Sequence, residues 1–442
     1  MSELTGGADA RVAVPISGHS SVADAAFRKI AWRLIPFLQL CFIVASMDRI
    51  NVGFARAQLA HDLRLSDAAF GFGAGLFFVG YVLVEVPSNL ILHRVGARRW
   101  LSRIMITWGI ASAATAWVQS DLSFYVLRFL LGIAEAGFAP GVLLYLTYWL
   151  PTGRRGRLLA VFMTSLAISG VVAAPVSGLI LGTMEGMAGM HAWQWMFVLE
   201  SLPAILLGIA ALRWLPESPK QASWLDAKER EAVAAELAGD LQPSVEERLW
   251  PLLRQPGVWW FGLAYFMLGV GVFGITFWLP TIIAQSHSLT PIEVGLISAA
   301  PWAAAVPAML YAGALSDRGA PLKVFAWGTG IGALALAGSA LLLGELPLLV
   351  GALVIAAAGL LSGVPVFWRS CSATMRGVAA AGGIAIVNCI GSFAGFVGPA
   401  LVGALKQASG GMVLPILAIS LIVLGASLPL MFAMKPAGRQ GA

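Results

Sequence analysis

The chain consists of long apolar stretches separated by short polar connections. Each stretch holds about 20 or more mostly apolar residues, which is the length that a helix needs to cross a bilayer. Outer-membrane barrels use alternating segments of roughly ten residues instead, so the pattern argues against a barrel. It predicts twelve transmembrane helices, near residues 33–55, 68–92, 99–119, 122–150, 156–182, 192–214, 256–284, 292–316, 322–343, 346–370, 378–405 and 411–434.

A polar segment divides these spans into two sets of six. Residues 215–255 carry many acidic and basic side chains, as expected of a solvated cytoplasmic linker. We therefore expect an all-α membrane protein with twelve transmembrane helices, built as two pseudo-symmetric six-helix bundles. The bundles are predicted over 33–214 and 256–434, with a cytoplasmic N-terminal segment over 1–32 and a cytoplasmic tail over 435–442.

Composition supports a membrane protein and narrows its chemistry. Hydrophobic residues make up 59% of the 442 residues and charged residues only 11%, whereas soluble domains contain about 25% charged residues. The three cysteines, Cys41, Cys371 and Cys389, lie in apolar sequence without disulfide, redox or metal-ligand spacing. We expect neither a metal site nor a cofactor.

The basic residues predict the orientation. With a cytoplasmic N-terminus, most of the 28 Lys and Arg residues fall on cytoplasmic segments, as the positive-inside rule requires. Both termini are then cytoplasmic, and the net charge of +6 reflects topology rather than nucleic-acid binding. The cytoplasmic residues to which we assign gating or structural roles are Arg94, Arg98, Arg99, Asp317 and Arg318. We expect Arg369 and Arg376 to serve only the topology. The cations predicted on the outer side are Arg56, Arg64 and Lys406.

The two halves look like copies of one unit. Leu92, Gly96 and Ala97 align with Leu315, Gly319 and Ala320 at an offset of 223 positions, in agreement with the span count and the linker. Parallel repeats of this kind occur in secondary transporters, where substrate binds between the halves. The same offset places Asp48, Glu85, Arg128, Glu135 and Glu200 on Gly271, Ala308, Gly351, Ala358 and Val423. The first copy alone therefore holds the buried charges, which suggests that it is specialised.

Four ionisable residues lie inside predicted spans one and four. Span one holds Asp48 and Arg49, and span four holds Arg128 and Glu135 on one helical face, seven positions apart. A charge at the bilayer centre costs about 2.5 to 3.5 kcal/mol, so these groups must face one another or a wet cavity. Two hypotheses stay open: ion pairs that lock the two spans together, or a transport site, which intramembrane ionisable groups commonly mark.

Side-chain chemistry separates the roles of the four residues. Arginine stays protonated and offers a planar fork of donors that matches a carboxylate, so Arg49 and Arg128 are candidate substrate-binding residues. Carboxyl groups exchange protons, and a neighbouring arginine changes how readily they do so, which makes Asp48 and Glu135 candidate proton-coupling residues. Asp48 and Arg49 are consecutive and point about 100° apart, so they need not pair with each other.

Other polar residues within the spans carry weaker signals. Glu85 lies near the cytoplasmic end of span two, where we expect it to brace the adjacent cationic loop. Glu200 is expected to form a packing or gating contact. Asn388 and Ser392 lie four positions apart on span eleven, where they suit either substrate binding or hydrogen bonding between helices.

Several motifs together resemble the major facilitator superfamily. More narrowly they are similar to its anion:cation symporter family, the bacterial carriers of tartrate, phthalate, hydroxyphenylacetate and sugar acids. The motifs are M-D-R-I-N-V-G-F-A (47–55), G-Y-V-L-V-E-V-P-S-N-L (80–90), R-V-G-A-R-R-W (94–100), R-F-L-L-G-I-A-E-A-G-F-A-P-G (128–141), F-W-L-P (277–280) and G-F-V-G-P (395–399). By this resemblance, Asp48 and Glu135 occupy the positions of the family's protonatable carboxylates, and Arg49 and Arg128 match its neighbouring arginines.

The expected function follows from the site and the resemblance together. We expect a proton-coupled symporter that imports a small organic carboxylate by alternating access, as a monomer in the bacterial inner membrane. An organic-anion exporter or antiporter of the same fold is the alternative. An enzyme is not expected, because the spans show no nucleophile paired with a base. The sequence names neither the carboxylate nor the number of protons.

Overall fold

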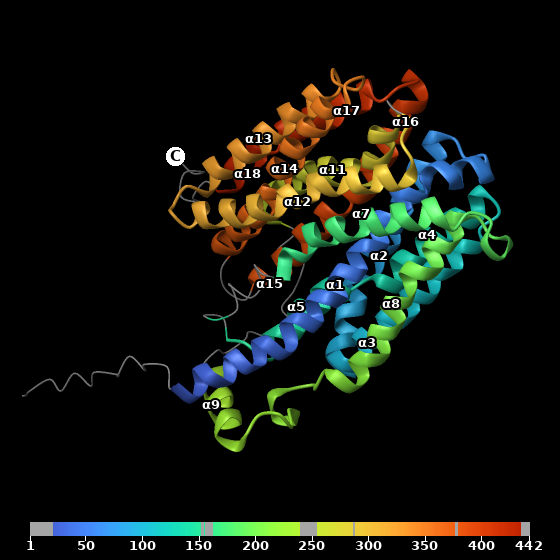
Figure 1. The fold of residues 1–442 in the computed structure, drawn as a ribbon. Coiled ribbons are helices and arrows are strands. Elements are labelled where there is room, and N and C mark those ends of the chain that lie inside the picture. The colour runs from blue at the N-terminus through green and yellow to red at the C-terminus, as the bar shows by residue number, and fades with distance from the viewer. Residues whose placement is uncertain are drawn as a thin grey trace, which may run out of the picture.

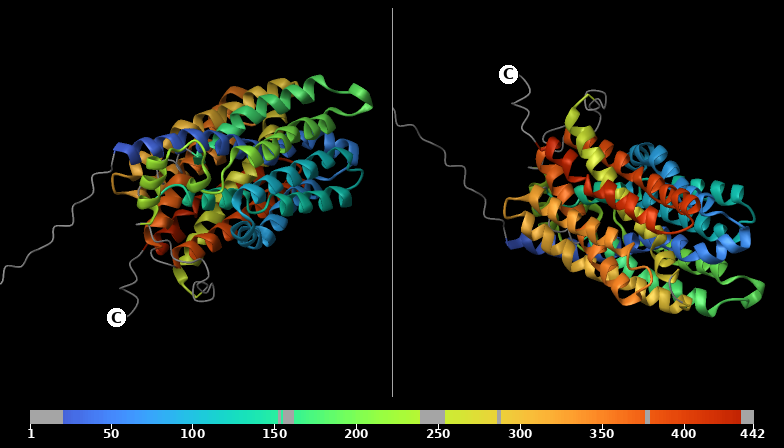
Figure 2. Two further views of the ribbon diagram at one scale, coloured as in Figure 1. Left: turned by 90° about the horizontal axis from the view of Figure 1, so that it is seen from below. Right: turned by 90° about the horizontal axis from the view of Figure 1, so that it is seen from above.

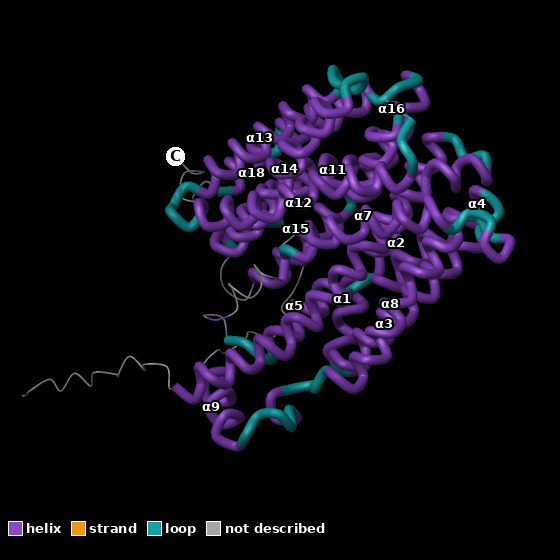
Figure 3. The backbone as a smooth tube through the Cα atoms, in the orientation of Figure 1, coloured by secondary structure: helices purple, strands orange, loops and turns teal. Residues whose placement is uncertain are grey.

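Helices form nearly all of the described chain, and loops join them at the two ends of the molecule (Figure 3). The computed structural model describes residues 21–151, 154, 162–238, 254–285, 288–375 and 379–434. The first six-helix bundle contains α1 (Ser21–Leu63), α2 (Asp67–Val95), α3 (Ala97–Ala114), α4 (Asp121–Glu135), α5 (Phe138–Thr147), α7 (Ser165–Thr183) and α8 (Ala192–Trp214). The second contains α11 (Pro256–Ala284), α12 (Pro291–Ser316), α13 (Pro321–Ser339), α14 (Leu346–Thr374), α15 (Ala379–Ser392), α16 (Ala394–Ser409), α17 (Val413–Leu424) and α18 (Ser427–Ala433).

The described helices match the twelve predicted spans. Eleven helical segments of the described chain are long and apolar enough to cross a membrane, with α4 and α5, α15 and α16, and α17 and α18 each counted as one span. The twelfth span is α3, which has 18 residues. Three arginines in its first two turns, Arg98, Arg99 and Arg103, make it less apolar than the other eleven segments. Its remaining turns are apolar and pack on α8 and α4, so α3 takes its place in the first bundle.

The first helix is much longer than the span predicted for it. It begins at Ser21 rather than near residue 33 and has 43 residues, about 65 Å at 1.5 Å per residue. A bilayer core is about 30 Å thick, so its N-terminal part projects beyond the membrane. We name this side of the molecule the α9 end, after the linker helix α9 (Ala227–Ala238), and the opposite side the far end (Figure 1).

The linker is not merely a solvated connection, because α9 docks on the projecting part of α1. Lys29 Nζ lies 2.9 Å from a carboxylate oxygen of Glu229. Arg154 joins the two helices, 2.7 Å from Asp24 and 3.0 Å from Glu236. These acidic partners raise the pKa of Arg154, and the ion pairs fix the start of the linker against the first bundle.

The two bundles converge at the far end and splay apart toward the α9 end (Figure 1), and the views from below and above show their helices running between these two ends (Figure 2). Two helix pairs join them at the far end, α2 with α16 and α7 with α12. At the α7–α12 crossing, a Cβ on Gly178 would meet the Pro291 carbonyl at 2.6 Å and the Gly295 Cα at 2.9 Å, so the backbones touch only because both residues are glycine. The α2–α16 crossing repeats this contact through Gly71 and Gly403.

The two crossings are related by the internal repeat that the sequence suggested. Gly71 and Gly295 differ by 224 positions, and Gly178 and Gly403 differ by 225, close to the predicted offset of 223. Ring contacts between the bundles fill the space between the crossings, with Phe78 and Phe273 centred 4.6 Å apart. The far end is therefore closed by backbone contact and by aromatic packing.

Candidate functional site

The candidate site is an ion pair between α1 and α4. Arg49 donates from Nε and Nη2 to Glu135 Oε1, at 2.8 and 2.5 Å. The Glu135 side chain is fully buried, while 17% of the Arg49 side chain stays exposed. The sequence placed both residues in the membrane, and the structure brings them into direct contact.

A break in the fourth span places Glu135 at the end of α4. The span was predicted as one helix over 122–150, but Ala136 has a non-helical conformation and Gly137 has φ of +87°, which favours glycine. Ser88 of α2 donates to the Ala136 carbonyl at 2.7 Å, which satisfies a backbone acceptor that the break leaves without a helical partner. Irregular backbone at membrane depth is tolerated where protein surrounds it, as it does here.

Asp48 points to a different helix from its neighbour Arg49. Its Oδ1 accepts from Ser112 of α3, and from Asn51 Nδ2 at 3.4 Å. Its Oδ2 has no hydrogen-bond partner, although only 3% of the residue is exposed. The two consecutive residues therefore belong to different contacts, as the 100° turn between them predicts.

Arg128 is the fourth charged residue of this group, and it is more deeply buried than expected. It is 1% exposed, its Nη2 donates to the Ala74 carbonyl at 3.3 Å, and its Nε has no partner. The guanidinium groups of Arg128 and Arg49 lie 5.1 and 5.4 Å from the centre of the Phe77 ring, within range of cation–π attraction. Of the four charged residues, Arg49 is the one whose side chain is part-exposed.

Glu85 does not brace the cationic loop, and that expectation is wrong. Its Oε1 accepts from Asn388 Nδ2 at 2.6 Å, and its Oε2 lies 3.4 Å from Cys389 Sγ, so it bridges α2 to α15 of the second bundle. The helical rotation of α2 turns Glu85 inward, away from the arginines that follow the helix. Asn388 thus binds a carboxyl group of the protein, while Ser392 lies half-buried at the end of α15.

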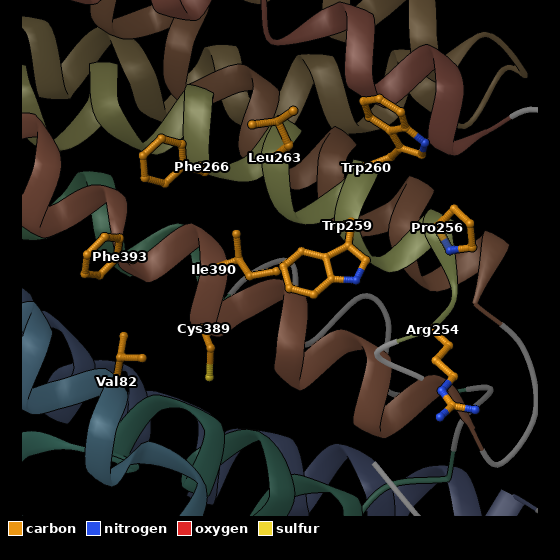
Figure 4. Close-up of a pocket in the computed structure, with 10 residues that line it drawn as sticks. All are labelled: Val82, Arg254, Pro256, Trp259, Trp260, Leu263, Phe266, Cys389, Ile390 and Phe393. Carbon is orange, nitrogen blue, oxygen red and sulfur yellow. The ribbon is translucent and has the colours of Figure 1, made fainter. Parts of the chain in front are cut away.

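A cavity of about 880 Å³ opens between the bundles toward the α9 end (Figure 4), and one residue of its wall, Cys389, contacts Glu85. Its walls are mainly apolar and come from α2, α11 and α15. Arg254 lies at one end, and Cys389 points toward the helix that carries Val82. The lining residues are Val82, Arg254, Pro256, Trp259, Trp260, Leu263, Phe266, Cys389, Ile390 and Phe393, and this set includes none of Asp48, Arg49, Arg128 and Glu135.

Three of the remaining residues predicted as gating or structural, Glu200, Arg98 and Asp317, form polar contacts. Ser177 of α7 donates to Glu200 of α8 at 2.7 Å, and Arg98 lies 3.7 Å from Glu217. Asp317 lies 3.0 Å from Arg369, which ties α14 to the end of α12. Arg94, Arg99 and Arg318 are exposed, and Arg376 lies outside the described residues. Within the described chain, no three His, Cys, Asp or Glu side chains gather as metal ligands would.

A group of charges at the far end was missed by the sequence analysis. Asp67 accepts from Arg56 of α1 and, at 2.6 Å, from Lys406 of α16, so it joins the two bundles. Arg56 also donates to Thr281 of α11 at 3.3 Å and lies 4.5 Å from the centre of the Trp278 ring. One feature of the sequence could have revealed this group: Arg56 and Lys406 are two of the three cations predicted on the outer side of the membrane.

We expect Asp67→Asn to loosen the far end. The substitution leaves two cations facing each other without their shared carboxylate, and a loss of about 1 to 2 kcal/mol would shift the ratio of closed to open molecules roughly five- to thirtyfold. Spin labels at Thr183 and Ser288, which flank the α7–α12 crossing, should report a longer distance. Asp121→Asn, at an exposed position of the same end, is the control. An unchanged distance in Asp67→Asn would show that glycine and aromatic packing alone close this end.

Comparison with known proteins identifies the family. The family model described as Major Facilitator Superfamily matches residues 38–399. The chain is 45% identical over 405 residues to NicT of Pseudomonas putida, named as a candidate metabolite transport protein, with 89% of this chain and 91% of NicT covered. It is 42% identical over 389 residues to a candidate tartrate transporter of Agrobacterium vitis, covering 87% and 85% of the two chains. It is 36% identical over 392 residues to the inner membrane transport protein RhmT of Escherichia coli, covering 86% and 89%.

Solved structures share the same fold at low sequence identity. A bacterial homologue of the human lysosomal transporter Spinster, in an inward-facing and occupied conformation, has a TM-score of 0.75 at 17% identity, covering 92% of this chain and 97% of that one. A D-xylose–proton symporter has a TM-score of 0.72 at 17% identity, covering 92% and 98%. The helices, the inter-bundle crossings and the relatives agree: the chain belongs to the major facilitator superfamily, a family of membrane transporters and not of enzymes.

Proposed function

We propose that this transporter is a proton-coupled symporter that imports a small organic carboxylate by alternating access. The observation that carries the proposal is the buried ion pair between Arg49 and Glu135. The α9 end is then cytoplasmic, with both termini on that side, and the conformation described is inward-open. The chain acts as a monomer in a bacterial inner membrane, and its partners are protons, the organic anion and lipid.

The ion pair links anion binding to proton binding. Arg49 offers its fork of donors to one carboxylate, and in this conformation that carboxylate belongs to Glu135. A proton on Glu135 removes the negative charge that holds Arg49, so the guanidinium becomes free to bind a substrate carboxylate. Proton and anion therefore favour each other's binding, as symport requires, whereas antiport requires them to compete.

Asp48 and Arg128 have complementary roles in this proposal. Asp48 Oδ2 and Arg128 Nε are buried without a partner, and such atoms cost free energy unless the transport cycle supplies one. We assign Asp48 to proton coupling with Glu135, and Arg128 to substrate binding with Arg49. We also assign Asn388 and Ser392 of α15 to the proposed substrate contacts.

The relatives and the membrane potential support a carboxylate carried with protons. One relative is named as a candidate tartrate transporter and another as an inner membrane transport protein. A membrane potential of 100 mV contributes about 2.3 kcal/mol for each charge that crosses. An imported anion gains from this potential only when more than one proton accompanies each negative charge.

An exporter or antiporter of the same fold is the second candidate. One relative, 39% identical over 404 residues, is named a quinolone resistance transporter and comes from Acinetobacter baumannii. The name of that relative favours outward movement of an amphiphilic acid, and the mainly apolar 880 Å³ cavity suits such a molecule.

Uptake into proteoliposomes tests the proposal. A panel of labelled tartrate, an aromatic carboxylate and a sugar acid is offered with and without an imposed pH gradient, acidic outside. Symport predicts accumulation of one class of acid only when the gradient points inward, together with alkalinisation outside. Accumulation with the opposite gradient would establish the antiporter, and uptake that ignores both gradients would overturn proton coupling.

A further inference from the structure

Glu85 is a buried carboxyl group whose hydrogen-bond partners both come from the other bundle. It lies on α2 and is 4% exposed, and Asn388 and Cys389 of α15 contact its two oxygens at 2.6 and 3.4 Å. The other buried carboxyls of the described spans have their contacts within the first bundle: Asp48 with Ser112 and Asn51, Glu135 with Arg49, and Glu200 with Ser177. Among these carboxyls, Glu85 is the one whose surroundings change when the bundles move.

No cation of the described chain forms an ion pair with Glu85 within 4.0 Å. The titratable or charged groups that face it are Arg49 on α1, Tyr81 on its own helix, Tyr265 on α11 and Cys389 on α15. Its direct partners, an amide and a thiol, are neutral. An ionised carboxylate that is buried with neutral partners alone is costly, and such a group takes up a proton instead.

The cavity extends to one of the two partners of Glu85. Cys389 forms part of the cavity wall (Figure 4) and also contacts Glu85 Oε2, so this side chain lies between the carboxyl group and the 880 Å³ space. Val82, one turn before Glu85 on α2, lines the same cavity. Movement of α15 away from α2 removes both partners of Glu85 and opens it to this space.

We propose that Glu85 is a third proton-coupling residue, which holds a proton while Asn388 and Cys389 bridge the bundles and exchanges it when they separate. This proposal rests on the proton-coupled function proposed above. In the exchange, the O–H bond of Glu85 breaks, water takes the proton, and a carboxylate is left facing water. Arg49 is the cation that faces Glu85, and its release from Glu135 would stabilise that carboxylate, which links Glu85 to the ion pair.

The test measures protons moved per substrate in proteoliposomes of the full chain, with a pH dye inside and the labelled acid of the panel that the unmodified protein accumulates. Glu85→Gln keeps the size of the side chain and an acceptor for Asn388, but it cannot carry a proton. We expect it to lower the proton-to-substrate ratio by one and to reduce gradient-driven accumulation at least tenfold, while exchange of labelled for unlabelled acid persists. Glu231→Gln, on the exposed face of α9, is the matched control and should leave the ratio unchanged.

The outcomes separate this proposal from the proposed function. If the unmodified protein moves no protons with the acid, the proposed function fails. If the unmodified protein is coupled and Glu85→Gln keeps the same ratio, Glu85 is only a structural bridge and the present proposal is overturned. Cys389→Ala provides a second measurement: loss of its contact with Glu85 should move the pH dependence of exchange while keeping the ratio, whereas a purely structural contact would leave that pH dependence unmoved.

Discussion

Glu135→Gln is expected to remove most of the accumulation driven by a pH gradient while exchange of substrate across the membrane stays measurable. Glutamine fills the space of the carboxyl group and still offers Arg49 an acceptor, but it cannot bind and release a proton. Each coupled proton contributes about 1.4 kcal/mol per pH unit, which is a tenfold accumulation. With a gradient of two pH units, loss of one coupled proton should therefore lower accumulation about a hundredfold.

Asp48→Asn should behave in the same way, because its unpartnered Oδ2 is the second proposed proton site. The measurement compares gradient-driven uptake with counterflow exchange in the same proteoliposomes, and Glu231→Gln again serves as the control. A structural role predicts something different. If both carboxyl variants lose exchange and driven uptake equally, the two groups hold the fold together and do not carry protons.

Much of the fold could be predicted from the sequence because hydropathy acts on whole spans. Each span has about 20 mostly apolar residues, so a single exception such as Arg128 in α4 hardly alters the pattern. The start of α1 was placed 12 residues too late, since its N-terminal turns are amphipathic and contact α9. That contact joins residues 200 positions apart, and no local pattern reveals it.

The sequence predicted the part of the site that follows from the free-energy cost of placing charged side chains in the membrane. Four charges in the membrane had to find partners, and the contact between Arg49 and Glu135 meets that expectation. The hydrogen bond of Asp48 to Ser112 was not predictable, because serines are frequent in the spans and nothing in the sequence marks this one. Glu85 was assigned to the nearest cationic loop by proximity in sequence. Its true partner Asn388 is 303 positions away, and only the rotation of α2 decides which it meets.

Arg49→Gln is expected to abolish both driven uptake and exchange, unlike the carboxyl variants. It removes the one part-exposed cation of the site, and truncating a buried, hydrogen-bonded charge costs about 2 to 5 kcal/mol of binding, roughly thirtyfold or more in affinity. It also leaves the Glu135 carboxylate buried without its partner, which destabilises a protein by about 3 to 5 kcal/mol. Substrate-dependent uptake and a thermal unfolding midpoint in detergent measure the two effects separately.

The double variant Arg49→Gln with Glu135→Gln decides between the two hypotheses that the sequence left open. Two neutral amides can hydrogen-bond to each other, so the double variant should recover most of the lost thermal stability. If the pair serves transport, neither uptake nor exchange returns, because no guanidinium remains at this position to bind the anion. If the pair only locks α1 against α4, exchange should return together with stability, and the anion would then have to be bound without Arg49, with Arg128 as the remaining cation of the site.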